Sequence, residues 1–359
     1  MTVANGRRFL SIPGPTTVPD EVLSAMHRPA IDIYVGELVD TTAHCLESLT
    51  KVFRTQGRTY IYAANGHGAW DAALSNVLSR GDKVLVLESG LFAVGWGEMA
   101  HMLGIQVEVL PGDLRRAVDP SAVEQRLRDD RQHEIKAVLV VQVDTASGVV
   151  NDIPAIRAAI DAAGHGALLM VDAIASLATM PFEMDDWGID VAVTGSQKGL
   201  MMTPGLSFVA AGSRAVEMHQ NADLRSRYWD WTFREGPLHY QKYCGTPPEH
   251  LMFGQSKAFD MLLGEGLEAV WQRHRILAGM VRAAVGKWTE AGAMEFNILN
   301  DTERADSVTT ILLNGSDAGD LLKLCAAQCG VTIGIGIGPL DGKAIRIAHM
   351  GHINAPMVL

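Results

Sequence analysis

The stretch Ile189-Asp190-Val191-Ala192-Val193-Thr194-Gly195-Ser196-Gln197-Lys198-Gly199 decides the fold class of this chain. Its apolar first half predicts a buried strand, which is followed at once by a glycine and a lysine. A second apolar run, residues 167–171, closes on Asp172 in the same way. Parallel strands of an α/β sheet open their carboxyl ends onto one crevice, where such sheets bind ligands. We therefore expect Asp172 and Lys198 to lie close together at that edge.

Strand-like runs recur through the first two thirds of the chain, at residues 59–63, 83–87, 106–110, 137–143, 167–171, 189–193 and 206–210. Helical patterns lie between several of them, at residues 69–79, 120–128 and 153–163. Strands that alternate with helices predict a mostly parallel sheet covered on both faces. The expected fold class is α/β, with a seven-stranded, mostly parallel sheet.

The pattern changes after a loop at residues 236–248 that is rich in Gly, Pro, Tyr and His. A helical stretch over residues 249–291 follows, with a break at Gly264-Glu265-Gly266. Strands at 307–312, 331–333 and 344–348 and a helix at 318–328 then predict a compact α+β unit. We expect an N-terminal arm at 1–15, a large domain at 16–260 and a small domain at 261–359.

Composition places the chain among ordinary globular proteins, with 359 residues, 48% hydrophobic and 20% charged. A net charge of −11 without a basic tract argues against a nucleic-acid surface. No apolar run has membrane-spanning length, and residues 1–10 lack the apolar core of a signal peptide. We expect a cytoplasmic protein with reduced cysteines and no metal site. Cys325 and Cys329, four residues apart in a helical pattern, are expected to pack on one helix face.

Asp172 and Lys198 together suit pyridoxal phosphate, because its ring nitrogen needs an acidic partner and its aldehyde needs an amine. The pair has an ordinary alternative interpretation. An Asp at a strand end commonly caps the next helix, and a Ser-Gln-Lys turn is commonly solvated.

Three other strand ends carry residues that suit the same cofactor. Asn65-Gly66-His67-Gly68 joins a strand to a helix, whose free N–H groups would bind phosphate. Phe92 would lie against a flat ring, and Thr145 would donate a hydrogen bond to a ring oxygen. Each has a structural alternative: a turn, a core aromatic or a capped turn. Together they place five groups at one edge of one sheet.

The chain resembles the class V aminotransferases of fold-type I, in particular the alanine-, serine- and aspartate–glyoxylate group. The matching stretches span nearly the whole chain: Ile12-Pro13-Gly14-Pro15-Thr16, Asn65-Gly66-His67-Gly68, Asp172-Ala173-Ile174-Ala175-Ser176, Trp187-Gly188-Ile189-Asp190, Thr194-Gly195-Ser196-Gln197-Lys198-Gly199, Pro204-Gly205-Leu206, Gly264-Glu265-Gly266-Leu267-Glu268 and Arg346-Ile347-Ala348-His349-Met350-Gly351.

The resemblance implies a role for each matching residue. Lys198 would bind the cofactor aldehyde, Asp172 would pair with the ring nitrogen, and Arg346 would clamp the substrate carboxylate. Further cofactor contacts are implied for Asn65, Gly66, His67, Phe92, Thr145, Ile174 and Gln197. Tyr243 and Thr246 match a pair that reaches the phosphate of a neighbouring subunit, which implies a homodimer with shared active sites. Tyr34 lies where this chain departs from its relatives, so that part of the substrate pocket differs.

The activity implied is a ping-pong transamination from a small amino acid to a 2-oxo acid, with glyoxylate as the expected acceptor. A cysteine desulfurase or related lyase of the same fold is the nearest alternative, and a non-catalytic binding protein is the other. The amino donor stays open. A second cation for an acidic donor would come from Arg225, Arg227, Arg234 or Lys242. The aromatic run Tyr228-Trp229-Asp230-Trp231 would line the entrance or pack in a dimer interface.

Overall fold

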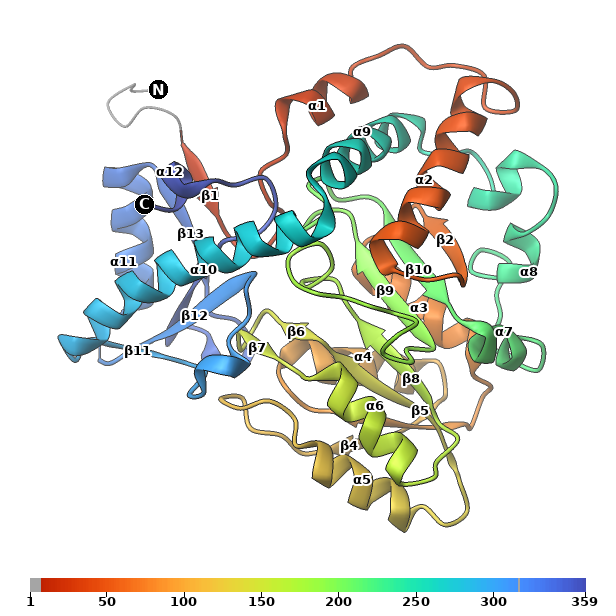
Figure 1. Ribbon diagram of the computed structural model, residues 1–359, viewed down its shortest axis with the longest axis horizontal. Coiled ribbons are helices and arrows are strands. Elements are labelled where there is room, and N and C mark those ends of the chain that lie inside the picture. Colours follow the sequence, from red (N-terminus) through yellow and green to blue (C-terminus); the bar gives the residue numbers. More distant parts are fainter. Residues whose placement is uncertain (1–7, 316) are drawn as a thin grey trace.

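The computed structural model describes residues 8–315 and 317–359, and its largest element is a seven-stranded sheet (Figure 1). Six of the strands run in one direction, and only β10 is antiparallel to both of its neighbours. This confirms the predicted fold class. In spatial order the strands are β2 (Arg58–Tyr62), β10 (Ser207–Ala211), β9 (Val191–Gly195), β8 (Leu168–Asp172), β5 (Ile135–Val141), β3 (Lys83–Leu87) and β4 (Gln106–Leu110).

One strand ends two residues earlier than the sequence pattern predicts. Strand β5 stops at Val141 rather than at Val143. The backbone N–H of Gly148 donates to the carbonyl of Asp144, and Gly148 has a φ of 81°. This turn folds β6 (Val143–Asp144) back onto β7 (Val149–Val150), so Val143 leaves the large sheet.

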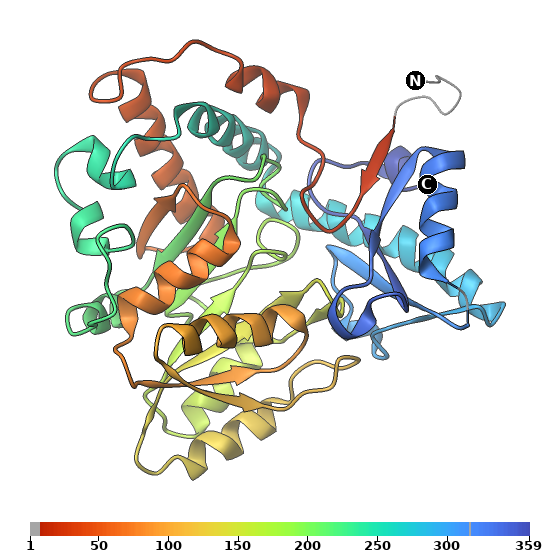
Figure 2. The same ribbon diagram turned by 180° about the vertical axis from the view of Figure 1, so that it is seen from behind.

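Helices cover both faces of the large sheet, as Figure 2 shows from behind. Side chains of β8 alternate between two buried clusters: Leu169 and Val171 join one, and Leu168 and Met170 join the other. The first cluster takes in α2 (Glu37–Phe53), α5 (Pro120–Asp129), α6 (Ile153–Ala162) and α9 (Glu249–Glu265). The second takes in α3 (Gly66–Val77), α4 (Leu91–Met102) and α7 (Ser213–His219).

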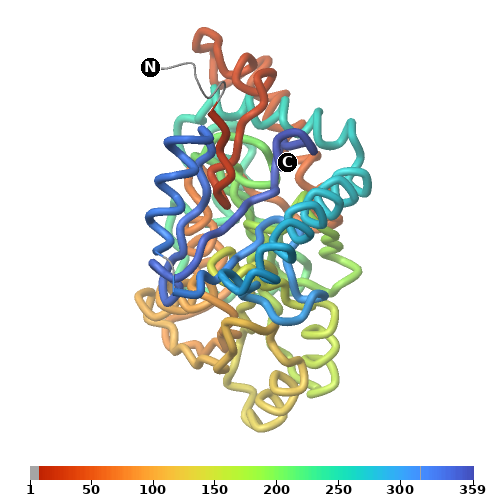
Figure 3. The backbone as a smooth tube through the Cα atoms, turned by 90° about the vertical axis from the view of Figure 1, so that its left-hand side faces the viewer, coloured from red at the N-terminus to blue at the C-terminus, as the bar shows by residue number. Residues whose placement is uncertain are grey.

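A second sheet of five strands lies beside the first, and its C-terminal segments face the viewer in Figure 3. Its strands are β1 (Phe9–Ser11), β13 (Val331–Ile335), β14 (Ala344–Ala348), β12 (Val308–Leu313) and β11 (Met294–Phe296) in spatial order. Val285 of α10 (Leu267–Glu290) packs in its core with Ile311 and Ile345. Strand β1, which belongs to the expected N-terminal arm, is an edge strand of this sheet and pairs in parallel with β13.

The predicted break in the long helical stretch is present. Helix α9 ends at Glu265, and α10 begins at Leu267 after Gly266, which has a φ of 88°. Helix α9 packs on α1 (Asp20–Met26) and α2, whereas α10 packs on β11 and β12. The domain limits at residues 15 and 260 stay a prediction.

The helix expected at 318–328 is not regular. An α-helix, α11 (Ala318–Leu324), gives way to a π-helical turn at Cys325–Cys329, where Gly330 N–H bonds to the carbonyl of Cys325. None of the helices among the described residues is long and apolar enough to cross a membrane.

Candidate active site

A cavity of about 350 Å³ opens at the carboxyl ends of the parallel strands. Strand β8 ends there in Asp172, β9 leads to Gln197 and Lys198, and β2 leads to the start of α3. The fold thus brings ten of the predicted residues to one lining: Asn65, Gly66, His67, Phe92, Thr145, Asp172, Ile174, Gln197, Lys198 and Arg346.

Lys198 is buried beneath the N-terminal segment. Its Nζ donates a 2.6 Å hydrogen bond to the carbonyl oxygen of Pro13, and only 8% of the residue is exposed. Burial lowers the pKa of Lys198 to about 8, although the charge of Asp172 opposes this change. A lysine of this kind holds a substantial neutral fraction near neutral pH and is therefore suited to nucleophilic and proton-transfer work.

Asp172 is a buried carboxylate with a donor on each oxygen. Its Oδ1 accepts from the backbone N–H of Ile174 at 2.6 Å, and its Oδ2 accepts from the indole Nε1–H of Trp70 at 2.8 Å. Burial raises the pKa of Asp172 to about 7, and these two donors and Lys198 act in the opposite direction. The two hydrogen-bond donors therefore stabilise the negatively charged form of Asp172 in a buried position.

Arg346, on β14, brings a cation from the second sheet. Its Nε donates to the carbonyl of Ile335 at 2.6 Å and its Nη1 to the carbonyl of Thr145 at 2.9 Å. Burial lowers the pKa of Arg346 to about 10, so it stays charged at neutral pH. No described carboxylate forms an ion pair with it, and Nη2 has no partner among the described residues. A buried guanidinium in this state is suited to an external carboxylate.

The start of α3 supplies a site for an anion. The side chain of Asn65 caps the helix by accepting from Gly68 N–H at 3.2 Å. The first N–H groups of a helix have no acceptor within it, and those of Gly66 and His67 have none elsewhere among the described residues, so they suit a ligand. A Cβ on Gly66 would lie 2.4 Å from Cδ1 of Ile174, so any larger residue here would have to displace that side chain.

Phe92 is held in place by Asp144, a residue that the sequence patterns did not single out. Oδ2 of this fully buried carboxylate accepts from the backbone N–H groups of Phe92 and Ala93 at 2.9 and 3.2 Å. These are the first-turn donors of α4, whose own N-cap, Gly90, has no side chain to offer. A buried acid one residue before Thr145 was the available signal.

Trp70 and the segment Pro13-Gly14-Pro15 also line the cavity without having been predicted as site residues. Trp70 was visible only as an aromatic one helical turn after Gly66. Contact between residue 13 and residue 198 has no signal in a single sequence, because it depends on how two distant segments cross.

Three predicted residues lie outside this cavity. Tyr34 is 66% exposed on the loop before α2, and Thr246 is exposed as well. Tyr243 is buried, and its hydroxyl lies 2.7 Å from Oγ1 of Thr42. The role expected for Tyr243 and Thr246 involves a second chain, so it stays a prediction.

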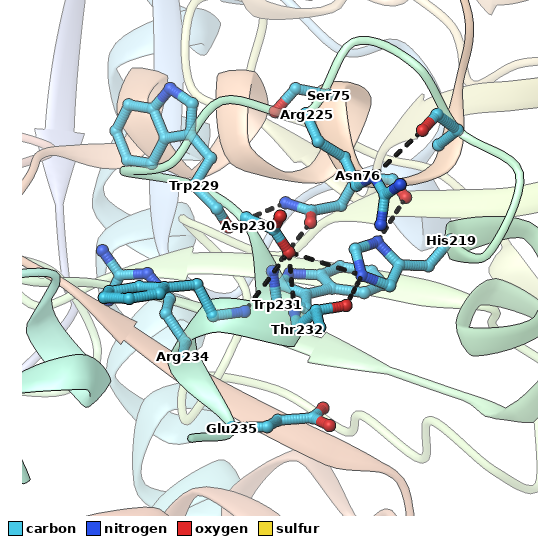
Figure 4. Close-up of polar contacts among 12 residues, drawn as sticks. Ser75, Asn76, His219, Arg225, Trp229, Asp230, Trp231, Thr232, Arg234 and Glu235 are labelled. Carbon is cyan, nitrogen blue, oxygen red and sulfur yellow. Dashed lines mark hydrogen bonds and ion pairs between the residues drawn. The ribbon is translucent and has the colours of Figure 1, made fainter. Parts of the chain in front are cut away.

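Trp229, Asp230 and Trp231 lie beside Asn76 of α3, as Figure 4 shows. Asn76 Nδ2 donates to the carbonyl of Trp229, and Asn76 Oδ1 accepts from Trp231 N–H. Trp231 is 1% exposed and stacks on Tyr60 with ring centroids 5.0 Å apart, so it is a core residue. None of the four candidate second cations, Arg225, Arg227, Arg234 and Lys242, lines the cavity.

Comparison with known proteins identifies the family of this chain. The profile of the family aminotransferase class-V covers residues 9–339. The chain is 39% identical to the serine–glyoxylate aminotransferase of Methylorubrum extorquens, over 97% of this chain and 88% of the relative. It is 37% identical to the L-aspartate–glyoxylate aminotransferase of Paracoccus denitrificans, over 97% and 87%. The solved alanine–glyoxylate aminotransferase of Nostoc sp. superposes with a TM-score of 0.86 at 25% identity, over 96% and 90% of the two chains.

The fold is therefore that of a fold-type I aminotransferase. The chain belongs to the class V aminotransferase family, as its sequence motifs predicted.

Proposed function

We propose that this aminotransferase uses pyridoxal phosphate to move the amino group of a small L-amino acid, with serine the favoured donor, to glyoxylate. One observation carries the proposal: Lys198, Asp172 and the unpaired cation of Arg346 line the same cavity. An amine, a buried acid and a carboxylate clamp are the three groups that this reaction requires.

The residues present fit the cofactor. The free N–H groups at the start of α3 suit its phosphate, and Phe92 and Ile174 line the same space as Asp172. Oε1 of Gln197 is buried and has no hydrogen-bond partner among the described residues. Pyridoxal phosphate would supply an electron sink for the carbanion formed at the substrate Cα.

Asp172, Arg346 and Lys198 each have a separate task in this proposal. Asp172, as a carboxylate, holds a proton on the ring nitrogen. Arg346 binds the substrate carboxylate and so orients the Cα–H bond toward Lys198. The neutral amine of Lys198 would take the proton from the substrate Cα and deliver it to the aldehyde carbon of the cofactor, and it would reverse this transfer in the second half-reaction. The amino group would stay with the cofactor between the two half-reactions, which gives ping-pong kinetics.

The cavity lining supports a donor with an uncharged side chain. Lys198 and Arg346 are the only Lys or Arg residues in it among the described residues, and both are needed for the reaction itself. A second carboxylate on the donor would find no further lysine or arginine among the described residues that line this cavity. Serine fits this requirement, and the relative from Methylorubrum extorquens is a serine–glyoxylate aminotransferase.

A homodimer is part of the proposal. The loop before α2 and the loop before the 3₁₀ helix His239–Tyr243 expose Tyr34, Val35 and Leu238 by 66%, 65% and 55%. The loop before α2 touches the start of this 3₁₀ helix, because Nδ1 of His239 lies 2.6 Å from the carbonyl oxygen of Ile33. An exposed apolar surface of this kind suits a subunit contact.

The free thiols of Cys45, Cys244, Cys325 and Cys329 support the expected cytoplasmic location.

The desulfurase alternative has no support in the cavity. None of these four cysteines lines it. The likeness to a solved cysteine desulfurase from Thermococcus onnurineus, at 16% identity, shows the fold alone.

The test is a donor screen with purified protein and added pyridoxal phosphate. L-serine, L-alanine and L-aspartate are each supplied with glyoxylate, and glycine is measured. We expect turnover with serine above aspartate, parallel lines in double-reciprocal plots, and no turnover by Lys198→Ala. Absence of glycine from all three donors, with the cofactor bound, would overturn the proposal.

A further inference from the structure

Trp70 contacts Asp172 from a different element of the fold. It lies on α3, one turn after Gly66, and its indole Nε1–H donates to Asp172 Oδ2 at 2.8 Å. The residue is 1% exposed. The only other donor to this carboxylate among the described residues is the backbone N–H of Ile174, which no substitution other than proline removes.

The indole of Trp70 is fixed by a set of ring contacts. It stacks on Trp96 with centroids 5.9 Å apart and planes at 16°. The rings of His67 and Phe92 pack on it in T-shaped arrangements, with ring centroids 4.6 and 6.4 Å from that of Trp70. Trp70 therefore contacts Asp172, His67 and Phe92, which all line the cavity. Packing against these rings and Trp96, rather than solvent, sets the orientation of its indole.

We propose that Trp70 is a positioning residue for the transamination: its indole N–H holds the Asp172 carboxylate in the orientation and charge state needed to face the cofactor ring nitrogen. This inference rests on the proposed function, since Asp172 matters in this way only if pyridoxal phosphate binds here.

The physical reason is the cost of a buried negative charge. A carboxylate removed from water is stabilised by hydrogen bonds to its charged form. Each oxygen of Asp172 has a single such donor, so the loss of one leaves that oxygen unsatisfied. Burial already raises the pKa of Asp172 to about 7, and loss of the indole donor would raise it further.

The chain offers a matched control. Trp96 is as buried as Trp70 and is its stacking partner, but its Nε1–H has no hydrogen-bond partner among the described residues. Trp70→Phe and Trp96→Phe make the same chemical change in the same aromatic cluster. Only Trp70→Phe removes a donor from Asp172.

The first experiment measures the dissociation constant of pyridoxal phosphate and the pH dependence of kcat/KM for all three proteins. A hydrogen bond to a charged group corresponds to roughly a tenfold effect or more. We expect Trp70→Phe to bind the cofactor about tenfold more weakly and to shift the acidic limb of the profile upward by about one pH unit. Trp96→Phe should match the wild type. Equal behaviour of the two variants would overturn the inference.

A second measurement needs no variant at the site. In wild-type apoprotein labelled with ¹⁵N in its indoles, the Nε1–H resonance of Trp70 should move as Asp172 titrates, and again when pyridoxal phosphate is added. The Trp96 resonance should stay in place during the pH titration. A Trp70 resonance that ignores pH would refute the inference, whereas a wild-type protein that binds no cofactor would refute the proposed function instead.

Discussion

The amine of Lys198 and the carbonyl of Pro13 are joined by a 2.6 Å hydrogen bond across 185 positions of sequence. The segment that makes this contact continues from β1, a strand of the second sheet. It also passes the backbone of the lysine, because Oγ1 of Thr16 donates to the carbonyl of Lys198 at 3.1 Å. Both sheets are therefore tied to the position of one reactive amine.

Gly14→Ala is expected to disturb Lys198 directly. A Cβ at Gly14 would lie 2.9 Å from Cε of Lys198, and the φ of Gly14 is 97°. We expect kcat to fall at least about tenfold, because a misplaced general base loses its alignment with the substrate. Single-turnover kinetics with serine measure this step.

Gly36→Ala is the control for backbone strain. Gly36 also has a positive φ, 79°, but nothing lies within 4 Å of its Cβ position. Both variants should lose about 1 kcal/mol of stability for the left-handed backbone. An equal loss of kcat in the two variants would show that contact with Lys198 is not the cause.

Arg346→Gln should separate substrate binding from cofactor binding. Removing one member of a buried charge pair costs several kcal/mol, so kcat/KM for serine should fall by about two orders of magnitude. The dissociation constant of pyridoxal phosphate should change less than about threefold. Arg227→Gln, at a side chain stacked on Phe233 outside the cavity, should leave both values unchanged. A cofactor affinity that falls as far as kcat/KM would contradict the assignment.

Gly66→Ala should weaken cofactor binding through a single clash. The new methyl would lie 2.4 Å from Cδ1 of Ile174. We expect the dissociation constant of pyridoxal phosphate to rise at least about tenfold, because overpacking of this kind costs about 1–3 kcal/mol. Ile174→Val removes the clashing methyl, so the double variant should recover much of the affinity. No recovery would mean that Gly66 acts through something other than this contact.

Acid should weaken the fold through His274. Its Nδ1 lies 2.7 Å from the carbonyl oxygen of Val270, and its Nε2 accepts from Gly351 N–H at 3.0 Å, so only the neutral ring satisfies both neighbours. Burial lowers the pKa of His274 to about 4. Its contribution is therefore fully present above the ordinary histidine pKa of about 6.5 and is lost as pH falls toward 4, by about 3 kcal/mol.

Urea unfolding of the apoprotein between pH 8 and pH 4 measures this loss. His274→Gln should make the dependence shallower, because this imidazole no longer has to be protonated in its buried position. The buried His349, whose pKa burial lowers to about 3, still contributes at the acid end. The exposed His352 provides the control, and His352→Gln should follow the wild-type curve. Parallel curves for all three proteins would show that other groups control acid unfolding.

The sequence by itself determined which residues stand at the strand ends. Alternation of apolar runs with helical patterns predicted the seven strands to within two positions, and this placed Asp172, Lys198 and the turn at Gly66 at one edge. Such information is local, because a strand pattern and the residues that follow it lie within a few positions of each other. Two local details were nevertheless wrong: strand β5 ends two residues early, and residues 325–329 are π-helical rather than α-helical.

Only the tertiary structure decided how these residues are held. The bond from Trp70 to Asp172 spans 102 positions, the cap from Asp144 to Phe92 spans 52, and the bond from Arg346 to the Thr145 carbonyl spans 201. The pKa values near 7 and 8 for Asp172 and Lys198 likewise arise from burial by many distant segments. The direction of a side chain and its burial depend on how distant helices and strands pack against one another. Local sequence patterns do not specify that packing.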